Sequence, residues 1–182
     1  MLMRVIAGRL GGRRLKAPRG RVTRPTSDRV REALFAMLGE LEGASVLDLF
    51  AGSGALGIEA LSRGAGSAVF VERDAGVSKL LDANLAALGI GAPYAELRRA
   101  DARSALRSAR AEKETYDLIF IDPPYGQAHY WGPELAAALP PLLRPAAQIV
   151  VESDRRAPLE LPLEVERRRR YGDTLITIHR HQ

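Results

Sequence analysis

The feature that most constrains the fold is a regular alternation of short apolar runs with longer helical stretches. Apolar runs without polar alternation are typical of strands buried on both faces, and such strands separated by helices form a parallel sheet covered by helices. We therefore expect an α/β fold with a mostly parallel sheet. The expected strands cover 45–50, 68–72, 94–99, 116–122 and 147–152, and the expected helices cover 55–63, 74–88, 101–110 and 131–139.

A further helix and a hairpin flank this alternating region. Thr26 or Ser27 can cap a helix that the apolar spacing extends over 28–41. Near the C-terminus, the runs 163–170 and 174–179 are separated by a short turn containing Gly172, and so short a connection predicts an antiparallel pair. We interpret Arg167–Arg170 as part of this strand, with two arginines facing solvent, rather than as a second binding patch.

Composition excludes several classes of protein. The 182 residues include no cysteine, which rules out disulfides, thiolate metal sites and cysteine nucleophiles, and the three histidines offer little for a metal. We expect no metal. The sequence contains no run of about 18 apolar residues and no apolar signal-peptide region at its start. These features predict a cytoplasmic protein that makes no contact with a membrane.

Charge is distributed unevenly along the chain. Residues 1–31 carry ten Lys and Arg side chains but a single acid, Asp28, whereas the rest of the chain has more acids than bases. An apolar, β-prone run before Gly11-Gly12 predicts a small basic hairpin or flap within this segment. A basic arm on an acidic body indicates a polyanionic partner.

A glycine-rich loop follows the first expected strand. Gly52, Gly54 and Gly57 form a Gly-x-Gly-x-x-Gly pattern, and Glu72 stands at the end of the next expected strand. Such glycines let the backbone approach a ligand where a helix begins, and an acid in that position can accept the ribose hydroxyls of a nucleotide cofactor. A dinucleotide and S-adenosylmethionine both meet these conditions.

Asp48 favours S-adenosylmethionine over a dinucleotide. This residue precedes the loop where a dinucleotide would place its pyrophosphate, and a carboxylate repels phosphate in a cleft of low dielectric. The amino-acid tail of S-adenosylmethionine instead carries an ammonium group, which a carboxylate attracts. The loop therefore predicts a methyltransferase more strongly than a dehydrogenase. Asp101, which follows the strand expected at 94–99, could approach the adenine amino group or simply cap the next helix.

The second motif is Asp122-Pro123-Pro124-Tyr125, at the end of the strand expected at 116–122. Two prolines end a strand and hold the backbone carbonyls in fixed directions. Methylation of an exocyclic amine requires acceptors for its N–H groups, because the nitrogen lone pair is otherwise delocalised into the ring. The Asp122 carboxylate and the Pro123 carbonyl can supply these acceptors while Tyr125 stacks on the base, so positioning provides most of the catalysis. The tetrapeptide alone does not distinguish adenine N6, guanine N2 and the glutamine amide.

The N-terminal arm points to one family. Over nearly its whole length, and with the motifs in matching order, the chain resembles the RsmD family of bacterial 16S rRNA guanine-N2 methyltransferases. Two departures are mild, because many members have Phe in place of Tyr125 and a bulkier residue in place of Ala36. The matching segments are Arg4-Val5-Ile6-Ala7-Gly8, Arg13-Arg14-Leu15, residues 23–35, the glycine loop and the Asp-Pro-Pro-Tyr tetrapeptide.

The resemblance implies a fold, a reaction and a set of residues. The fold is a Rossmann-like class I methyltransferase domain dependent on S-adenosylmethionine, assigned to 28–182, with a basic N-terminal extension over 1–27 that contacts RNA. The reaction is methyl transfer to N2 of a guanine, of the guanine 966 type, in the 16S rRNA of the small subunit. The implied cofactor-binding residues are Asp48, Gly52, Gly54, Glu72 and Asp101, and the implied reactive residues are Asp122, Pro123 and Tyr125.

Arginines of the N-terminal region are the expected RNA contacts. Their side chains can hold phosphates that flank the target, and the target guanine must be unpaired or flipped out of its helix. We expect contacts from Arg13, Arg14, Arg24 and Arg29, with Arg24 and Arg29 nearest the target. We also expect a monomer, because the ribosomal partner supplies the large interface.

Two other interpretations stay open. A DNA adenine-N6 methyltransferase would share the loop and the tetrapeptide, although little of the chain remains for a domain that reads DNA sequence. A non-enzymatic RNA-binding protein would explain the basic arm but has no use for Asp48, Glu72 and Asp122 together.

Overall fold

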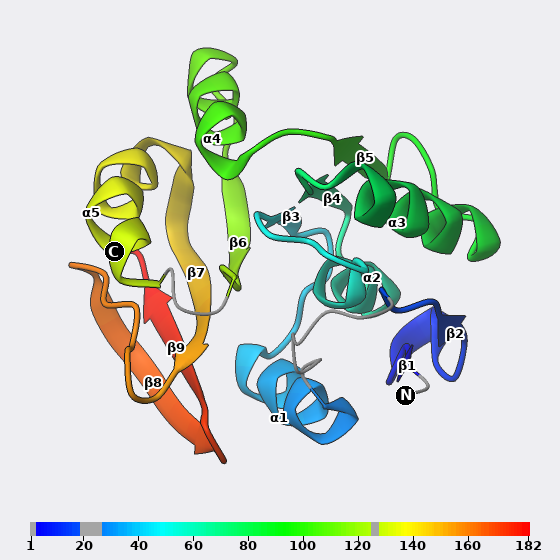
Figure 1. Ribbon diagram of the computed structural model, residues 1–182, viewed down its shortest axis with the longest axis horizontal. Coiled ribbons are helices and arrows are strands. Elements are labelled where there is room, and N and C mark those ends of the chain that lie inside the picture. The colour runs from blue at the N-terminus through cyan, green and yellow to red at the C-terminus, as the bar shows by residue number, and fades with distance from the viewer. Residues whose placement is uncertain (1–2, 19–26, 125–127) are drawn as a thin grey trace.

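The computed structural model describes residues 3–18, 27–124 and 128–182 (Figure 1). Strands and helices alternate along the chain in the expected order. The strands are β1 (Met3–Arg4), β2 (Arg14–Leu15), β3 (Ser45–Asp48), β4 (Ser67–Val71), β5 (Ala95–Arg98), β6 (Tyr116–Ile121), β7 (Leu143–Asp154), β8 (Glu164–Tyr171) and β9 (Thr174–Arg180). The α-helices are α1 (Asp28–Leu38), α2 (Ala55–Ser62), α3 (Ala75–Ala87), α4 (Ala102–Ala111) and α5 (Ala128–Ala138), and the 3-10 helices are η1 (Gly8–Leu10) and η2 (Pro140–Leu142).

A seven-stranded sheet forms the centre of the molecule, in the order β5-β4-β3-β6-β7-β9-β8. The five strands from β5 to β7 are parallel to one another, whereas β9 runs antiparallel to both β7 and β8. The expected α/β architecture with a C-terminal antiparallel hairpin is confirmed.

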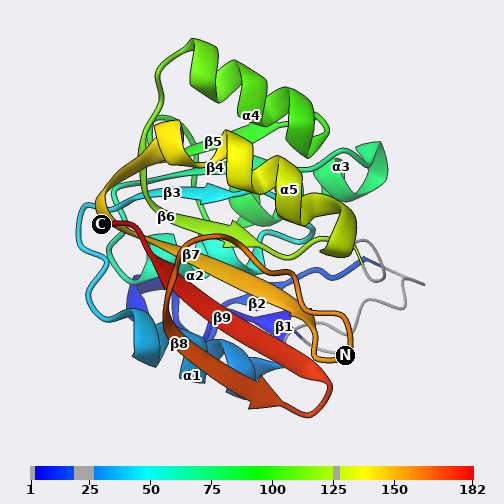
Figure 2. The same cartoon turned by 90° about the vertical axis from the view of Figure 1, so that its left-hand side faces the viewer.

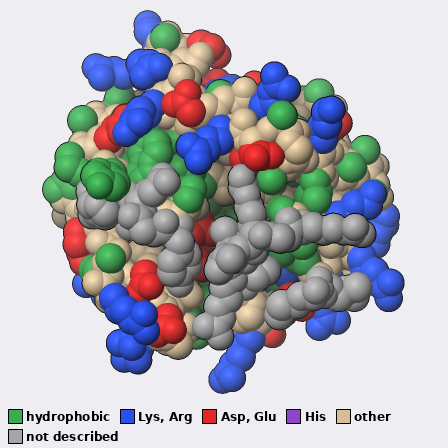
Figure 3. Space-filling model, viewed as in Figure 1, with side chains coloured by type: hydrophobic (Ala, Val, Ile, Leu, Met, Phe, Trp, Pro, Cys, Tyr) green, Lys and Arg blue, Asp and Glu red, His purple; other side chains and the backbone are tan. Residues whose placement is uncertain are grey.

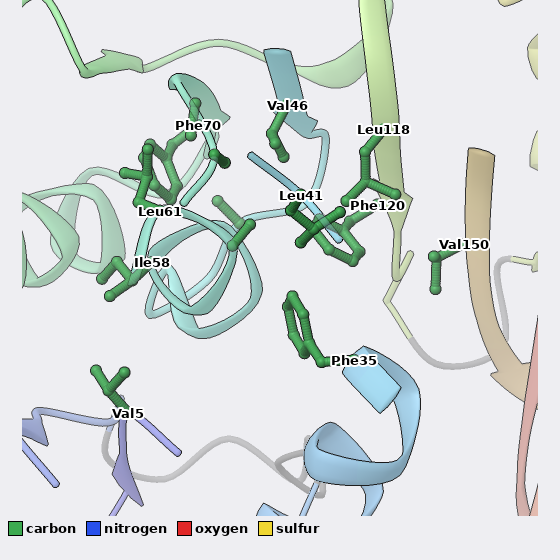
Figure 4. Close-up of a cluster of buried hydrophobic side chains, with 14 of the residues drawn as sticks. Val5, Phe35, Leu41, Val46, Ile58, Leu61, Phe70, Leu118, Phe120 and Val150 are labelled. Carbon is green, nitrogen blue, oxygen red and sulfur yellow. The ribbon is translucent and has the colours of Figure 1, made fainter. Parts of the chain in front are cut away.

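Helices cover both faces of this sheet (Figure 2). On one face, α1, α2 and α3 pack around Phe35, Ile58 and Phe120, and α4 and α5 pack on the other face. Figure 4 shows Phe35 of α1 pointing toward Phe120 of β6, and the two ring centroids lie 5.8 Å apart. The burial of apolar side chains in these two layers is the main force that holds the sheet between its helices.

Several boundaries differ from those expected. Ser27 caps α1 by accepting a hydrogen bond from the Val30 amide at 3.4 Å, but α1 ends at Leu38 rather than at residue 41. Gly39 follows with a φ of +79°, which glycine adopts without strain and which stops the helix. At the other end of the chain, β7 extends beyond the expected 147–152 in both directions, because Leu143 pairs with Tyr116 of β6 and β9 continues to pair with β7 as far as Asp154.

The N-terminal strands pack firmly against α2. Val5 is fully buried, and the buried carboxylate of Glu59 accepts hydrogen bonds from the amides of Ile6 and Ala7 at 2.7 and 3.0 Å. Gly8 has a φ of +78°, and a side chain at this position would overlap the backbone of Ser62. The hairpin is therefore part of the core rather than a free flap.

None of the helices in the described ranges combines the length and the apolar character needed to cross a bilayer.

Candidate active site

The carboxyl ends of β3 and β6 lie side by side in the middle of the sheet. From β3 the chain continues to β4 and β5 on one side, and from β6 it continues to β7 on the other, so the strand order reverses between β3 and β6. In open α/β sheets, ligands bind in the crevice outside such a reversal. Asp48 is the last residue of β3, and Asp122 directly follows the last residue of β6.

Asp48 is buried beneath the start of α2. The side chain is 3% exposed, and its Oδ2 accepts a hydrogen bond from the Gly57 amide at 3.1 Å, in the first turn of the helix. Burial raises the pKa of Asp48 to about 7, against the lowering effect of the Gly57 hydrogen bond, and the nearby Glu72 carboxylate raises it further. A cation bound beside Asp48 would therefore favour its charged form.

The three loop glycines serve different purposes. Gly52 and Gly54 have φ values of +55° and +81°, which disfavour other residues. A side chain at Gly54 would overlap Leu81 of α3, and one at Gly57 would overlap the Phe70 ring of β4, so these two glycines allow α2 to pack closely. Among the described residues, a Cβ at Gly52 would meet nothing closer than the Phe50 carbonyl oxygen at 4.0 Å, so these residues leave the loop open at this point.

Glu72 connects the glycine loop to the next βα unit. The residue follows β4 and is 8% exposed, with its Oε2 accepting a hydrogen bond from the Gly52 amide at 3.1 Å and its Oε1 one from the Asp74 amide at 2.8 Å. A carboxylate has about four lone-pair sites, so Glu72 retains capacity to accept hydroxyl donors as well.

Asp101 is the N-cap of α4. The exposed carboxylate accepts hydrogen bonds from the Ser104 amide at 3.1 Å and the Ser104 hydroxyl at 2.8 Å, and these bonds hold the pKa of Asp101 below its ordinary value. The capping alternative is thus satisfied in full, and a cofactor contact by Asp101 stays a prediction.

Asp122 and Pro123 directly follow the carboxyl end of β6, as the sequence predicts, and their part in the reaction stays a prediction. Asp122 as a residue is exposed, yet the protein around its carboxyl group disfavours the charged form and raises the pKa well above the ordinary value. The carboxylates of Glu152 and Asp48 raise this pKa further. Pro123 is buried and fixes the backbone beside Asp122. Tyr125 lies outside the described residues.

Glu152 is a candidate site residue that the sequence interpretation did not include. In the β6–β7 ladder Ile121 pairs with Val151, so continuing the register places Asp122 beside Glu152. A signal for it was present, because Glu152 ends an apolar run just as Glu72 does. What was missing was the strand order, which alone shows that β7 neighbours β6.

The arginines proposed for RNA binding lie in different places. Arg13 donates to the Ala87 carbonyl at 3.0 Å, at the C-terminal end of α3. This contact lies toward the amino ends of the parallel strands, on the side of the sheet away from the crevice. Arg14 and Arg29 are exposed, and Arg24 lies outside the described residues. Arg31 is 1% exposed and donates to Asp28 at 2.8 Å, so this arginine is structural rather than available to RNA. In the described part of the chain, no group of His, Asp and Glu side chains has the arrangement of a metal site.

Two curated relatives resemble the chain closely. YlbH of Bacillus subtilis is 41% identical over 98% of both chains. Ribosomal RNA small subunit methyltransferase D of Escherichia coli is 46% identical over 68% of this chain and 60% of its own length.

Solved structures show the same fold. That of the E. coli protein yhhF is 35% identical, with a TM-score of 0.82, and the match covers 100% of this chain and 99% of that one. An RNA methyltransferase from Salinibacter ruber, solved with S-adenosyl-L-homocysteine, shares the fold with a TM-score of 0.63 at 19% identity, over 86% of this chain and 92% of that one. The fold is that of the methyltransferases dependent on S-adenosylmethionine.

A family model described as conserved hypothetical protein 95 matches residues 3–180. Its match spans both the N-terminal arm and the Asp-Pro-Pro-Tyr motif. The chain therefore belongs to this family, which is the RsmD family that its motifs resemble.

Proposed function

We propose that this chain is a methyltransferase that transfers a methyl group from S-adenosylmethionine to the exocyclic N2 of a guanine, of the guanine 966 type, in the 16S rRNA of the small ribosomal subunit. The observation that carries the proposal is the placement of Asp122 and Pro123 at the carboxyl end of β6, beside the glycine loop where the strand order reverses. The name of the E. coli relative, ribosomal RNA small subunit methyltransferase D, supports the same class of substrate.

The residues around the glycine loop fit S-adenosylmethionine. The open side of Gly52 admits a ligand close to the backbone, and Asp48 offers a carboxylate whose charged form an ammonium or sulfonium group would stabilise. Glu72 retains lone pairs for ribose hydroxyls. In this proposal Gly54 shapes the loop and Asp101 lies toward the adenine.

The chain's own groups position the acceptor nitrogen. The bound cofactor supplies an electrophilic methyl group on a sulfonium. The Asp122 carboxylate accepts one N–H of the guanine amino group and the Pro123 carbonyl accepts the other, which directs the nitrogen lone pair out of the ring system and toward the methyl group. Once the nitrogen–carbon bond has formed, the amine becomes acidic, and the raised pKa of Asp122 suits it to receive the proton. Tyr125 is proposed to stack on the base.

The substrate must bring an unpaired base to this edge. A guanine within a helix must be flipped out before its N2 can reach Asp122. Exposed Arg14 and Arg29, together with Arg24, are proposed to hold phosphates near the target, whereas Arg13 is placed to reach a more distant part of the RNA. We further propose a cytoplasmic monomer, since the ribosomal particle itself supplies the large interface.

The experiment that tests this function measures tritium transfer from labelled S-adenosylmethionine to small subunits that lack the modification, followed by nucleoside analysis. The expected product is N2-methylguanosine. N6-methyladenosine would retain the mechanism but replace the substrate. If subunits, naked rRNA and DNA all stay unlabelled, the enzyme proposal fails and an RNA-binding protein becomes the better explanation.

A pair of variants tests the roles within the site. Asp122→Asn and Asp122→Ala are expected to abolish turnover while leaving the affinity for S-adenosylmethionine, measured by calorimetry, within a few fold of the original. Asp82→Asn changes an exposed acid on α3 and serves as the control. Normal turnover by Asp122→Ala would contradict the mechanism.

A further inference from the structure

The outer strand β8 carries four consecutive arginines, Arg167–Arg170, and all four are exposed. The expectation that only two of them face solvent is wrong, because β8 is the last strand of the sheet and the arginines on both of its faces are exposed. Figure 3 shows Lys and Arg side chains gathered at the lower left of the molecule, over the C-terminal hairpin.

Two of these arginines lie on the face of the sheet that carries the reacting carboxylates. Phe120 of β6 pairs with Val150 of β7, which pairs with Ile178 of β9. Ile178 in turn pairs with Arg167. Directly paired residues project from the same face of a sheet, so Arg167 shares the face of Phe120, and Asp122 lies two residues beyond Phe120 on that same face.

The next row of pairs gives the same result closer to the reacting edge. Glu152, the neighbour of Asp122, pairs with Ile176, and Ile176 pairs with Arg169. The row from Asp122 to Arg169 crosses three strand spacings, or about 14 Å between Cα atoms. Arg168 and Arg170 alternate with this pair and project from the opposite face.

The two faces of β8 also differ in how their arginines are neutralised. On the opposite face, Arg168 forms an ion pair with Glu160 at 2.8 Å. On the face of Asp122, the ion pair of Arg167 with Glu166 is long, at 3.9 Å, and the Arg169 guanidinium donates to the Arg168 carbonyl oxygen. Arg170, on the opposite face, donates to the Gly172 carbonyl oxygen at 3.0 Å, much as Arg169 donates to that of Arg168. The two faces therefore differ mainly at Arg167, which retains more of its capacity to bind an anion than Arg168 does.

The strand β8 and the N-terminal strands lie on opposite sides of the candidate site. The N-terminal strands pack on α2 and α3, on the side of β3 and β4, whereas β8 lies at the far edge beyond β7 and β9. An RNA segment that presents a flipped base at Asp122 would pass between these two basic regions. Arg forms forked, charge-assisted hydrogen bonds with phosphate, and such contacts set the register of a nucleic acid on its protein.

We propose that β8 is a second rRNA-binding surface, in which Arg167 and Arg169 bind backbone phosphates on the side of the target nucleotide opposite the N-terminal arm. This inference rests on the proposed function for the identity of the RNA. A competing explanation is that the charges only protect an open sheet edge from pairing with another strand. That explanation makes no distinction between the two faces of β8.

The test compares two charge-matched double variants of the full chain. Arg167→Gln with Arg169→Gln removes two arginines from the face of Asp122, and Arg168→Gln with Arg170→Gln removes two from the opposite face. The measurements are the affinity for small subunits that lack the modification across about 50 to 200 mM salt, KM and kcat for methyl transfer, and the affinity for S-adenosylmethionine.

The first double variant is expected to bind subunits about tenfold more weakly or worse, with a salt slope reduced by about 1 to 2 and with kcat and cofactor affinity unchanged. The opposite-face pair is expected to change subunit affinity by less than about threefold. Restoring charge with Arg167→Lys and Arg169→Lys is expected to recover most of the binding.

Equal losses in both double variants, or no loss in either, would overturn the proposal. Binding is measured separately from transfer, so the two proposals can fail independently. A chain that binds subunits through Arg167 and Arg169 but transfers no methyl group would contradict the proposed function and support the surface. If both double variants bind and methylate subunits normally, the proposed function is supported and the β8 surface is contradicted.

Discussion

At the scale of single residues, the buried Asp48 carboxyl makes the stability of the folded state depend on pH. Its pKa is about 7 in the folded protein against an ordinary value of 3.8, so between these values the folded state holds a proton that the unfolded chain has lost. The free energy of unfolding therefore falls as pH rises through this window, by at most about 4 kcal/mol from this group. A bound cation beside Asp48 would offset that cost.

Asp48→Asn should remove the contribution of Asp48 to this pH dependence and leave that of Asp122. The amide oxygen can still accept the Gly57 hydrogen bond, but the side chain no longer ionises. We expect the variant to melt at a higher temperature than the original protein at pH 8, with the difference shrinking toward pH 4, in calorimetric scans. Asp82→Asn, at an exposed position on α3, should follow the original protein throughout. Parallel profiles for all three proteins would show that Asp48 carries no such cost.

Glu152 should control the protonation of its neighbour Asp122. Its carboxylate raises the pKa of Asp122, so Glu152→Gln is expected to lower that pKa. Asp122 must be ionised to accept the guanine N–H, and the acidic limb of kcat/KM against pH should therefore move to lower pH. The profile for methyl transfer to subunits measures this shift. If the acidic limb stays in place or moves to higher pH, Glu152 does not raise the pKa of Asp122.

At the scale of elements, Glu59 joins the N-terminal strands to α2. The carboxylate is fully buried and accepts hydrogen bonds from the Ile6 and Ala7 amides and from the Arg63 guanidinium. Glu59→Gln replaces one carboxylate oxygen by an NH₂ group, which would then face an N–H donor that the carboxylate accepts in the original protein. We therefore expect a loss of about 2–4 kcal/mol in the free energy of unfolding. Urea unfolding measures this loss, and hydrogen exchange should show faster opening at Ile6 and Ala7.

A matched control is available in the exposed Glu40, which follows α1. Glu40→Gln makes the same chemical change and should alter the free energy of unfolding by less than about 0.5 kcal/mol. If the two Gln variants were equally stable, the Glu59 carboxylate would contribute nothing to holding the N-terminal strands on α2.

Elements whose signals are local could be predicted from the sequence. Ser27 was identified as a possible cap because a cap depends on its own amino-acid type and the next three residues. The glycine loop and the Asp-Pro-Pro strand end are similarly encoded in adjacent positions. The missed features depend on contacts between distant segments. Glu59 with Ile6, Glu152 with Asp122, and the Asp48 hydrogen bond to Gly57 follow from strand order and helix packing, which no local pattern contains.

The exposure of β8 is a further case in which strand order decided the outcome. Alternation within 163–170 predicts one buried and one exposed face, and the strand itself was correctly expected. The sheet order places β8 outermost, where neither face is deeply covered. Four arginines were therefore available where the pattern alone indicated two.

At the scale of the whole molecule, the basic N-terminal segment and the methyltransferase core share one hydrophobic interior. Val5 and Leu15 belong to the same buried cluster as Phe35 and Phe120. Asn84 of α3 joins the arm as well, since it accepts a hydrogen bond from the Lys16 amide at 2.9 Å. The boundary that we propose between 1–27 and 28–182 is thus a division of function, and the two parts fold together.

A fragment that begins at residue 28 should therefore fail to fold cooperatively. It loses two buried apolar side chains, each worth about 1.5–3 kcal/mol, and leaves the buried polar groups of Glu59, Ser62 and Asn84 without the partners that the arm provides. The combined loss is comparable to the whole stability of a domain of ordinary size, about 5–15 kcal/mol. Urea unfolding followed by circular dichroism compares this fragment with one that begins at residue 3, which retains every arm contact named here and should match the full chain. If the fragment 28–182 unfolded cooperatively within about 1 kcal/mol of the full chain, the arm would be an independent attachment, and its arginines could be placed on RNA without reference to the core.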